Sequence, residues 1–423
     1  MRLKLDYGKT GLEVDLPDEN LRAVLRVSSP APIEDCDTAI TDALRNPIGV
    51  RPLADIAAGR NDACIVICDI TRPVPNATLL APVLAELASA GLSRDNVTIL
   101  IATGTHRPNL GDELTSLVGA EIAQSVRIVN HDCHDMEQNR YLGMSPNGVP
   151  VWLDKTYCDA DLKITIGLIE PHFMAGYSGG RKLIMPGVAA METVKRWHSP
   201  RFLESPLATN HSVVGNPVHE ESLAIAKMMR PDFMMDVTLD GLNQITGVFA
   251  GDLEEAWLAG VDFAGKHVRA EAPELADIVV TSGAGYPLDA TFYQLIKGMV
   301  GALPVVKSGG TIIIAGQCPE GIGSPAFSDV LLGISDLEEF MIQISQPEVF
   351  LPEQWQIEEL VKAWRQANII TVCDIPESTV ARCHVTPAPD IAAALEMAFE
   401  RHGRNASLLA IPRGPYVIPF VSA

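Results

Sequence analysis

The stretch LKITIGLIEPHFMAGYSGGRK, residues 162–182, decides the fold expected for this chain and marks its most chemically rich segment. Its first part, residues 162–168, is a continuous apolar run of the kind that forms buried strands in parallel sheets. The part that follows gathers His172, Arg181 and Lys182 among glycines. Ligands in open α/β sheets bind beyond the carboxyl ends of strands, so we expect a ligand-binding loop directly after this strand.

The same alternation of strand and helix extends along the chain. Apolar runs bounded by turn residues occur at 63–68, 97–102, 162–168, 278–281, 311–315, 369–373 and 408–411. Helical patterns separate them, among them 77–90 (closed by Gly91), 253–269 and 391–401. Continuous apolar strands alternating with amphipathic helices are typical of parallel sheets covered on both faces. The sequence therefore predicts an α/β fold with two Rossmann-like domains, whose mainly parallel sheets flank a central cleft.

The length of 423 residues favours two domains, because one hydrophobic core rarely grows to that size. We expect an N-terminal catalytic and cofactor-binding domain over residues 1–270 and a C-terminal α/β domain over residues 271–405 that closes the cleft. The tail, residues 406–423, can pack back on the first domain. The segment AEAPE, residues 270–274, is the best candidate for the linker, because it follows a long helical pattern and precedes a new strand.

Composition excludes several classes of function. The net charge of −21 repels phosphate backbones, so we expect no nucleic-acid partner. The amino terminus lacks the apolar segment of a signal peptide, and no apolar run is long enough to span a bilayer, which predicts a cytoplasmic protein without membrane association. The eight cysteines are scattered without a C-x-x-C pair, and we interpret them as buried thiols rather than a metal site.

Polar motifs follow three of the predicted strands. DITRP (69–73) follows the run 63–68, TGTHR (103–107) follows 97–102, and EPH (170–172) follows 162–168. In a parallel sheet these strand ends lie along one edge, where their side chains can converge. Two imidazoles in one pocket can serve as acid and base in turn, and we interpret His106 and His172 as that pair.

Groups suited to anions accompany the two histidines. Arg72 can clamp a carboxylate, with Asp69 orienting it or accepting a hydrogen bond from a histidine, although a local Asp69–Arg72 ion pair explains these residues equally well. The loop 178–180 brings glycine N–H groups toward an anion that Lys182 can neutralise. The chemistry of this half is therefore that of an acid/base site for an anionic ligand.

Further histidines carry weaker signals. His198 lies close after the loop and can act as a third imidazole, a metal ligand, although no H-x-x-x-H spacing supports a metal site. His131 and His134 lie in HDCHD, which looks metal-like by composition. Because the segment that follows them is polar, we favour an exposed loop there.

The second half contributes one more strand end and one helix. The run 278–281 leads into SGAGYPLD (282–289), and the helix after it carries Gln294 and Lys297, which share a face and can bind one small polar ligand. A solvated face is the equal alternative. GAG (283–285) lacks the third glycine and the acidic residue of a dinucleotide fingerprint, so NAD binding is not expected. The residues alone fit proton or hydride chemistry on a small acid and do not identify the reaction.

Taken together, these motifs resemble those of the nickel-dependent lactate racemase family. The resemblance rests on D-x-x-RP (69–73), TGTHR (103–107), the stretch EPH through GGRK (170–182), HSP (198–200), and GYPLD with YQ-x-x-KG (285–298). The motifs follow in consistent order, and the chain length also matches. The sequence is thus identified as a member of that family.

The resemblance implies a cofactor and roles for individual residues. Enzymes of the family have two α/β domains around a cleft that holds a nickel-pincer nucleotide, a pyridinium mononucleotide whose sulfur-bearing arms bind nickel. By this likeness Lys182 is the lysine that can be tethered to the cofactor, His198 is the protein ligand to nickel, and His106 and His172 are the acid/base residues. The substrate-binding residues would be Asp69, Arg72, Tyr286, Gln294 and Lys297. We assign Ser178, Gly179 and Gly180 to the cofactor phosphate, on the chemistry of their glycines and hydroxyl.

The implied activity is racemisation or 2-epimerisation of a small 2-hydroxy acid by hydride transfer through a 2-oxo acid, with lactate as the default substrate. Enzymes that build the cofactor would be its partners. Two alternatives stay open: a histidine-based lyase or oxidoreductase without the pincer cofactor, and a carrier protein that stores or delivers the cofactor. The carrier has no use for two acid/base histidines, which argues against it.

Overall fold

The apolar run 162–168 forms β9 (Leu162–Leu168), an interior strand of a six-stranded sheet. The order of this sheet is β13-β12-β9-β4-β5-β6, and only the edge strand β13 runs antiparallel to its neighbour. Its other strands are β4 (Ala63–Cys68), β5 (Val97–Ala102), β6 (Arg127–Asn130), β12 (Phe233–Leu239) and β13 (Ile245–Gly251). The predicted runs 63–68, 97–102 and 162–168 are confirmed as strands to the residue.

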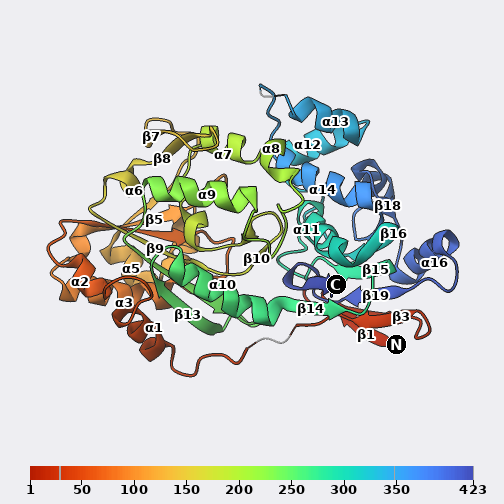
Figure 1. Cartoon of the computed structure of the whole chain (residues 1–423), viewed down its shortest axis with the longest axis horizontal. Coiled ribbons are helices and arrows are strands. Elements are labelled where there is room, and N and C mark those ends of the chain that lie inside the picture. The colour runs from red at the N-terminus through yellow and green to blue at the C-terminus, as the bar shows by residue number, and fades with distance from the viewer. Residues whose placement is uncertain (28–29, 347, 423) are drawn as a thin grey trace. The chain divides into compact units, whose positions relative to one another are not determined.

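The structure, a computed structural model, describes residues 1–27, 30–346 and 348–422 (Figure 1). Its described residues divide into two compact units. The N-terminal unit comprises residues 30–198 and 205–267, and the C-terminal unit comprises residues 1–27, 199–204 and 268–422. Each unit has one large, mainly parallel sheet, so the predicted α/β class is confirmed.

Apolar side chains on both faces of the N-terminal sheet explain why helices cover it. In β9 every residue except Lys163 is buried, and Ile164 and Ile166 pack in one core with Ile65 and Ile67 of β4 and Ile99 of β5. The helix α3 (Asn76–Ser89) lies against this core and ends before Gly91, which takes the left-handed φ of +94°. The remaining elements of the unit are α1 (Cys36–Arg45), α2 (Leu53–Ala57), α4 (Gly111–Val118), α5 (Ala120–Ser125), β7 (Asn139–Met144), β8 (Pro150–Asp154), α6 (Lys155–Asp159), β10 (Pro171–His172), β11 (Gly176–Tyr177), α7 (Met191–Trp197), α9 (Pro217–Met228) and α10 (Glu255–Val268).

The sheet of the C-terminal unit has the order β18-β17-β16-β15-β19-β3 and is parallel throughout. Its strands are β3 (Leu21–Val24), β15 (Ala276–Ser282), β16 (Val306–Ala315), β17 (Ala367–Val372), β18 (Thr386–Pro387) and β19 (Leu408–Ile411). Around it lie β1 (Arg2–Leu5), β2 (Leu12–Asp15), α8 (Pro200–Leu203), α11 (Phe292–Ala302), α12 (Pro325–Gly333), α13 (Leu337–Ile344), α14 (Gln354–Gln366), α15 (Glu377–Val380) and α16 (Ile391–His402).

The two chain ends belong to this second sheet, which differs from the predicted division. The sequence placed residues 1–270 in the first domain and allowed the tail to pack there. In the structure β3 pairs with β19, and β19 pairs with β15. Hydrogen bonding to interior strands of the second sheet therefore holds both the amino-terminal segment and the tail in the C-terminal unit.

The prediction of a linker at residues 270–274 is also wrong. Residues of this segment belong to β14 (Arg269–Ala272), which pairs in parallel with β20 (Ile418–Val421). Ala270 and Ala272 are buried while Arg269 and Glu271 are exposed, the alternation of a half-buried strand. Alanine and glutamate have low strand propensity, so the segment carried no strand signal that would have opposed the linker prediction.

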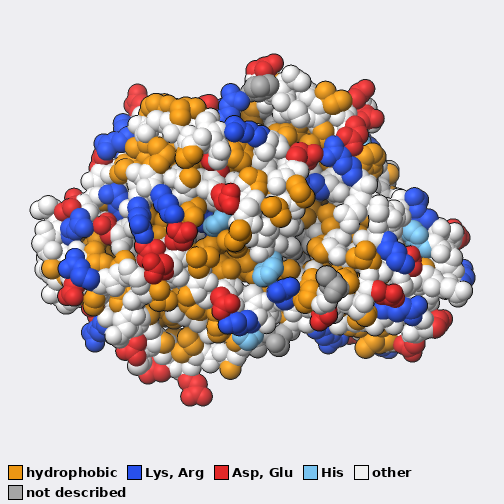
Figure 2. Space-filling model, in the orientation of Figure 1, with side chains coloured by type: hydrophobic (Ala, Val, Ile, Leu, Met, Phe, Trp, Pro, Cys, Tyr) orange, Lys and Arg blue, Asp and Glu red, His pale blue; other side chains and the backbone are white. Residues whose placement is uncertain are grey.

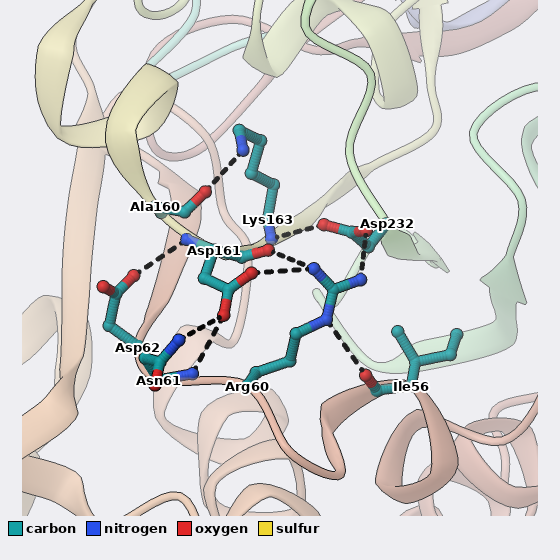
Figure 3. Close-up of polar contacts among 8 residues, drawn as sticks. All are labelled: Ile56, Arg60, Asn61, Asp62, Ala160, Asp161, Lys163 and Asp232. Atoms are coloured by element: carbon teal, nitrogen blue, oxygen red, sulfur yellow. Dashed lines mark hydrogen bonds and ion pairs between the residues drawn. The ribbon is translucent and has the colours of Figure 1, made fainter.

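Charged side chains at the amino ends of β4, β9 and β12 bind to one another (Figure 3). The guanidinium of Arg60 donates to the Asp161 carbonyl at 2.7 Å, to Asp161 Oδ1 at 2.9 Å and to Asp232 Oδ1 at 3.1 Å. Asp232 also accepts from the backbone of Lys163 at 2.9 Å. This network, the amino-edge network, connects the residues that precede three adjacent strands.

The surface carries charge of both signs. In the view of Figure 2, Lys and Arg side chains are interspersed with Asp and Glu side chains rather than gathered in one basic block. None of the described helices is long and apolar enough to cross a membrane.

Candidate active site

The carboxyl ends of β4 and β5 place Asp69 beside His106. Cys68 and Ala102 are in register at the ends of these strands, and the Nδ1 of His106 lies 2.7 Å from Asp69 Oδ2. The Asp69 side chain is only 5% exposed, whereas His106 is 55% exposed. Because the carboxylate accepts the proton on Nδ1, the lone pair of neutral His106 lies on Nε2. The hydrogen bond from a histidine to Asp69, one of the alternatives offered by the sequence, is therefore present, and it leaves Nε2 as the nitrogen that can accept a proton.

Arg72 pairs with Glu170, not with the neighbouring Asp69 that the sequence offered as one alternative. Its guanidinium donates to Glu170 Oε1. Burial acts to lower the pKa of Arg72, but Glu170, Cys68 and Asp69 together outweigh burial, and the pKa lies above its usual value. Asp69 instead accepts from the hydroxyl of Thr71 at 2.6 Å. A permanent cation thus stands at the end of β4, next to the Asp69–His106 pair.

The hairpin after β9 holds His172 against Lys182. Strands β10 and β11 pair across His172 and Gly176, and the Nδ1 of His172 accepts from the backbone of Met174 at 3.4 Å and of Ala175 at 3.3 Å. The Nε2 of His172 lies 3.0 Å from Lys182 Nζ. The two side chains are therefore within hydrogen-bonding distance, and the tautomer of His172 sets which nitrogen donates. A lysine is nucleophilic in its uncharged amine form.

A buried carboxylate fixes the loop that carries Lys182. Asp236 of β12 is fully buried, and its Oδ2 accepts from the Gly180 N–H at 2.6 Å. Burial raises the pKa of Asp236 to about 7, against the opposing effects of the Gly180 N–H and of Arg181. A Cβ at Gly179 would lie 2.3 Å from the same carboxylate, and Gly179 has a φ of +73°. Only glycine fits this approach of loop to carboxylate.

Arg181 points into the protein rather than toward a ligand. It is 1% exposed, its carbon Cζ lies 4.2 Å from the centre of the Trp257 ring, and its Nη2 donates to the Ala175 carbonyl at 2.8 Å. Burial lowers its pKa to about 9 despite the nearby Asp236. Trp257 in turn donates to the Ser178 carbonyl at 2.8 Å. Arg181 and Trp257 therefore stabilise the loop from its buried side.

The same geometry argues against the phosphate assignment made from the sequence. The Ser178 hydroxyl donates to the Leu168 carbonyl at 2.6 Å and accepts from the Glu170 N–H at 3.0 Å. The Gly180 N–H is bonded to Asp236, and a phosphate there would meet a buried carboxylate. The donors of Ser178 and Gly180 are thus used within the protein, so they are not available to a phosphate.

His198 is a buried imidazole at the end of α7. The backbone N–H of His198 donates to the Val194 carbonyl at 2.9 Å, and the imidazole ring packs on the Trp197 ring with centroids 4.3 Å apart. Burial and, to a smaller extent, the nearby Lys182 lower the pKa of His198 to about 3. Neutral imidazole is the form that binds metals. Within the described residues no three His, Cys, Asp or Glu side chains converge, so a metal at His198 needs donors from a bound molecule as well.

The other predicted substrate residues belong to the C-terminal unit. Gln294 and Lys297 share a face of α11 and are both partly exposed. The Oε1 of Gln294 is buried and has no hydrogen-bond partner in the part of the chain that the structure describes. Tyr286 is 49% exposed, with the Lys9 Nζ 4.8 Å above its ring. The part in substrate binding that the sequence suggests for these residues stays a prediction.

Asp289, the last residue of the GYPLD motif, is buried and bonded to the backbone of other segments of its unit. It is fully buried, and its Oδ2 accepts from the Gly8 N–H at 2.6 Å and from the Gln317 N–H at 2.9 Å. Nearby, Tyr293 of α11 donates to Glu353 at 2.9 Å. These contacts hold the start of α11, which carries Gln294 and Lys297.

Sequence reasoning missed several residues that shape the site. Asp236 had a signal, because it is the only charged residue in the strand FMMDVTL (233–239). Glu170 was quoted within its motif but received no role. His131 is buried rather than exposed, with Nδ1 2.9 Å from Asp154 Oδ2 and Nε2 3.0 Å from the Ala189 carbonyl. Because these partners are distant in sequence, the motif alone does not indicate them.

Comparison with known proteins finds matches along almost the whole chain. The family models of the lactate racemase N-terminal domain and the lactate racemase C-terminal domain match residues 7–210 and 272–419. The lactate racemase of Thermoanaerobacterium thermosaccharolyticum is 34% identical over 421 residues, which is 98% of each chain. The lactate racemase of Lactiplantibacillus plantarum is 33% identical over 422 residues, covering 98% of this chain and 99% of that one.

Solved structures show the same likeness. The lactate racemase apoprotein from Thermoanaerobacterium thermosaccharolyticum matches with a TM-score of 0.94, covering 99% of this chain and 100% of that chain at 34% identity. A protein from Thermotoga maritima matches with a TM-score of 0.68 at 17% identity, covering 94% of this chain and all of its own. The second likeness is one of fold alone.

Proposed function

This chain belongs to the lactate racemase family, and we propose that it interconverts the enantiomers of a small 2-hydroxy acid, with lactate as the default substrate. The observation that supports this most is the pair of histidines at one edge of the N-terminal sheet, each fixed by its own partner. His106 bonds to Asp69, and His172 contacts Lys182. Racemisation needs two such groups, because the hydroxyl groups of the two enantiomers point to opposite sides.

Each histidine would handle the hydroxyl proton of one enantiomer. His106 takes the proton on Nε2, and the buried Asp69 stabilises the imidazolium that results. His172 would handle the hydroxyl proton of the other enantiomer through Nε2, the ring nitrogen that lies 3.0 Å from Lys182 Nζ. A planar 2-oxo acid is the common intermediate, and return of the hydrogen to its other face gives the opposite enantiomer.

The residues present fit a nickel-pincer nucleotide as the resident cofactor. His198 offers a neutral imidazole to the metal, and Lys182 offers an amine for a covalent tether. When bound, this cofactor would supply the acceptor for the α-hydrogen as hydride. The requirement for donors beyond His198 agrees with a metal that arrives already bound to an organic ligand. The cofactor would come from dedicated biosynthetic enzymes, which are the partners we propose.

Fixed cations and amides would hold the substrate. Arg72 stays charged at any working pH and can bind the carboxylate, with Glu170 fixing its orientation. Gln294, Lys297 and Tyr286 are the polar groups that we propose for the substrate in the C-terminal unit. No nucleic acid or membrane partner enters this proposal.

The test is to incubate the protein, produced together with the cofactor-building enzymes, with enantiopure D- or L-lactate and other 2-hydroxy acids. Chiral chromatography should show a racemic mixture from either enantiomer, and the His106→Ala/His172→Ala double variant should show none. Net 2-oxo acid formation with added NAD, without the opposite enantiomer, would instead support the lyase or oxidoreductase. Cofactor binding without turnover of any acid would support the carrier.

A further inference from the structure

Two thiols meet at the carboxyl edge of the C-terminal sheet, away from the groups assigned above. β16 and β17 are in register at Ala315 and Val372, and the chain beyond both strands stays bonded. The Gly316 N–H donates to the Val372 carbonyl at 3.1 Å, and the Asp374 N–H donates to the Gln317 carbonyl at 3.1 Å. Cys373 is therefore opposite Gly316 and Gln317, and Cys318 is the next residue.

The side chains of this pair interact and differ in exposure. Each thiol shifts the pKa of the other, which places the two close together. Cys318 is 3% exposed, whereas Cys373 is partly exposed. Cys318 also has a φ of +54°, a left-handed backbone that few residues other than glycine adopt. A strained, buried thiol thus faces an accessible one.

The thiols of this chain do not share one chemistry. Burial raises the pKa of Cys133 to about 11 and of Cys158 and Cys383 to about 12, which makes these thiols inert. The hydrogen bond between Cys318 and Cys373 instead lowers the pKa of Cys373 and raises that of Cys318. One member of the pair is thereby the readier nucleophile and the other its proton donor.

We propose that Cys318 and Cys373 form a redox-active dithiol site that exchanges with low-molecular-weight disulfides of the glutathione class. The Cys373 thiolate attacks one sulfur of oxidised glutathione, forming a mixed disulfide and releasing one glutathione thiolate. Cys318 then loses its proton and attacks the Cys373 sulfur, which forms the protein disulfide and releases the second glutathione. Two protein thiols are oxidised, and one small disulfide is reduced to two thiols.

The site is connected to the motif that precedes α11. The Cys318 N–H donates to the Asp289 carbonyl at 2.8 Å, and the Gln317 N–H donates to the Asp289 carboxylate at 2.9 Å. A disulfide requires a narrow range of Cα separations, and any backbone adjustment of Cys318 toward that range would be passed through its hydrogen bond to the segment that holds Asp289. Oxidation therefore reaches the start of the helix that carries Gln294 and Lys297.

The test is intact-mass analysis of the folded, full-length protein after incubation with oxidised glutathione, followed by peptide mapping without reduction. The wild type should lose the mass of two hydrogens and yield a linked Cys318–Cys373 peptide. Cys318→Ser should instead accumulate a glutathione adduct on Cys373, because the resolving thiol is absent. Cys373→Ser should leave Cys318 unmodified. The matched control is Cys36→Ser, which removes another partly exposed thiol and should leave the 318–373 product unchanged.

Absence of the linked peptide in the wild type, or a Cys373 adduct that persists there, would overturn the proposal. Racemisation provides a second test, which rests on the proposed function. The racemisation activity should fall on oxidation and return with a dithiol reductant. Equal activity of the oxidised and reduced forms would contradict the connection to Asp289. Failure of the proposed function would appear as no racemisation in either form, while the mass result stands apart from it.

Discussion

The two edges of the N-terminal sheet carry similar residue types and use them differently. At the amino edge, Arg60 is bonded to Asp161 and Asp232, and these carboxylates also accept from backbone N–H groups (Figure 3). At the carboxyl edge, Asp69 bonds to a histidine that is itself 55% exposed. The amino-edge charges thus bind one another, while the carboxyl-edge charges prepare another group for chemistry.

This difference indicates that the residues with a functional role lie at the carboxyl edge of the sheet. Parallel strands bring side chains together at both ends, but the loops that follow the strands are the ones that reach a ligand. A charged side chain whose partners all lie within the protein stabilises the strands. A charged side chain that orients a histidine or a lysine is instead suited to a catalytic site. Substitutions at the two edges should therefore separate activity from stability.

The largest effect is expected at the carboxyl edge. His106→Ala or His172→Ala should lower the kcat of racemisation by about 10²–10⁴-fold, because a general acid/base is lost, with little change in the melting temperature. Chiral chromatography and thermal unfolding of the same preparations measure both. Near-normal kcat in either variant would remove that histidine from the mechanism.

Loss of the metal is the next largest effect. His198→Ala should release nickel from the cofactor-loaded protein, since the variant removes the buried neutral imidazole. His134→Ala, which removes an exposed histidine, is the control and should keep its nickel. Elemental analysis by mass spectrometry after desalting decides the matter, and nickel retained equally in both variants would refute the role of His198.

The two edges should respond to pH with opposite signs. Burial raises the pKa of Asp236 to about 7 from an ordinary value of 3.8, so the native state holds a proton that the unfolded state releases between these pH values. Its contribution makes the free energy of unfolding fall as pH rises from about 4 to about 7, by at most about 4 kcal/mol. The pKa of Asp161 is lowered by the Asn61 N–H and by Arg60, so its contribution is present above the unfolded pKa and is lost as pH falls below it.

Asp236→Asn should remove the first of these dependences, and Asp161→Asn should remove the second. Urea unfolding at a series of pH values, with the wild type alongside, measures both slopes. The sign assignment fails if Asp236→Asn keeps the decline of stability between pH 4 and 7.

The smallest effect belongs to the amino-edge network. Arg60→Ala should lower the free energy of unfolding by about 1 kcal/mol, as expected for a partly exposed ion pair, and should leave kcat unchanged. Urea unfolding and the racemisation assay test this. A large loss of kcat in Arg60→Ala at an unchanged free energy of unfolding would contradict the assignment of stability to the amino edge and activity to the carboxyl edge.

The sequence could predict what depends on local pattern. Continuous apolar runs predicted β4, β5 and β9 to the residue, and glycine chemistry predicted the end of α3. The pairing of Asp69 with a histidine was one of two alternatives, and it could be considered because adjacent parallel strands bring their ends together. Such inferences need only the strand period and the sheet direction.

What the sequence could not predict depends on sheet order and long-range partners. Asp236 meets Gly180 because β12 is the neighbour of β9, and nothing in the loop motif indicates that neighbour. The phosphate assignment of Ser178, Gly179 and Gly180 did not anticipate the partners that Ser178 and Gly180 already have, and it stays a prediction. Likewise β14 was mistaken for a linker because its pairing partner β20 lies at the far end of the chain.

The central claim is that the two histidines move only the hydroxyl proton, while the α-hydrogen never passes to a protein base. The most direct measurement is racemisation of L-lactate in deuterium oxide by the cofactor-loaded protein, with the product read by mass spectrometry and NMR. We expect D-lactate that keeps ordinary hydrogen on its α-carbon. Deuterium at the α-carbon of the product would contradict it, because a histidine would then have taken the proton from carbon and exchanged it with solvent.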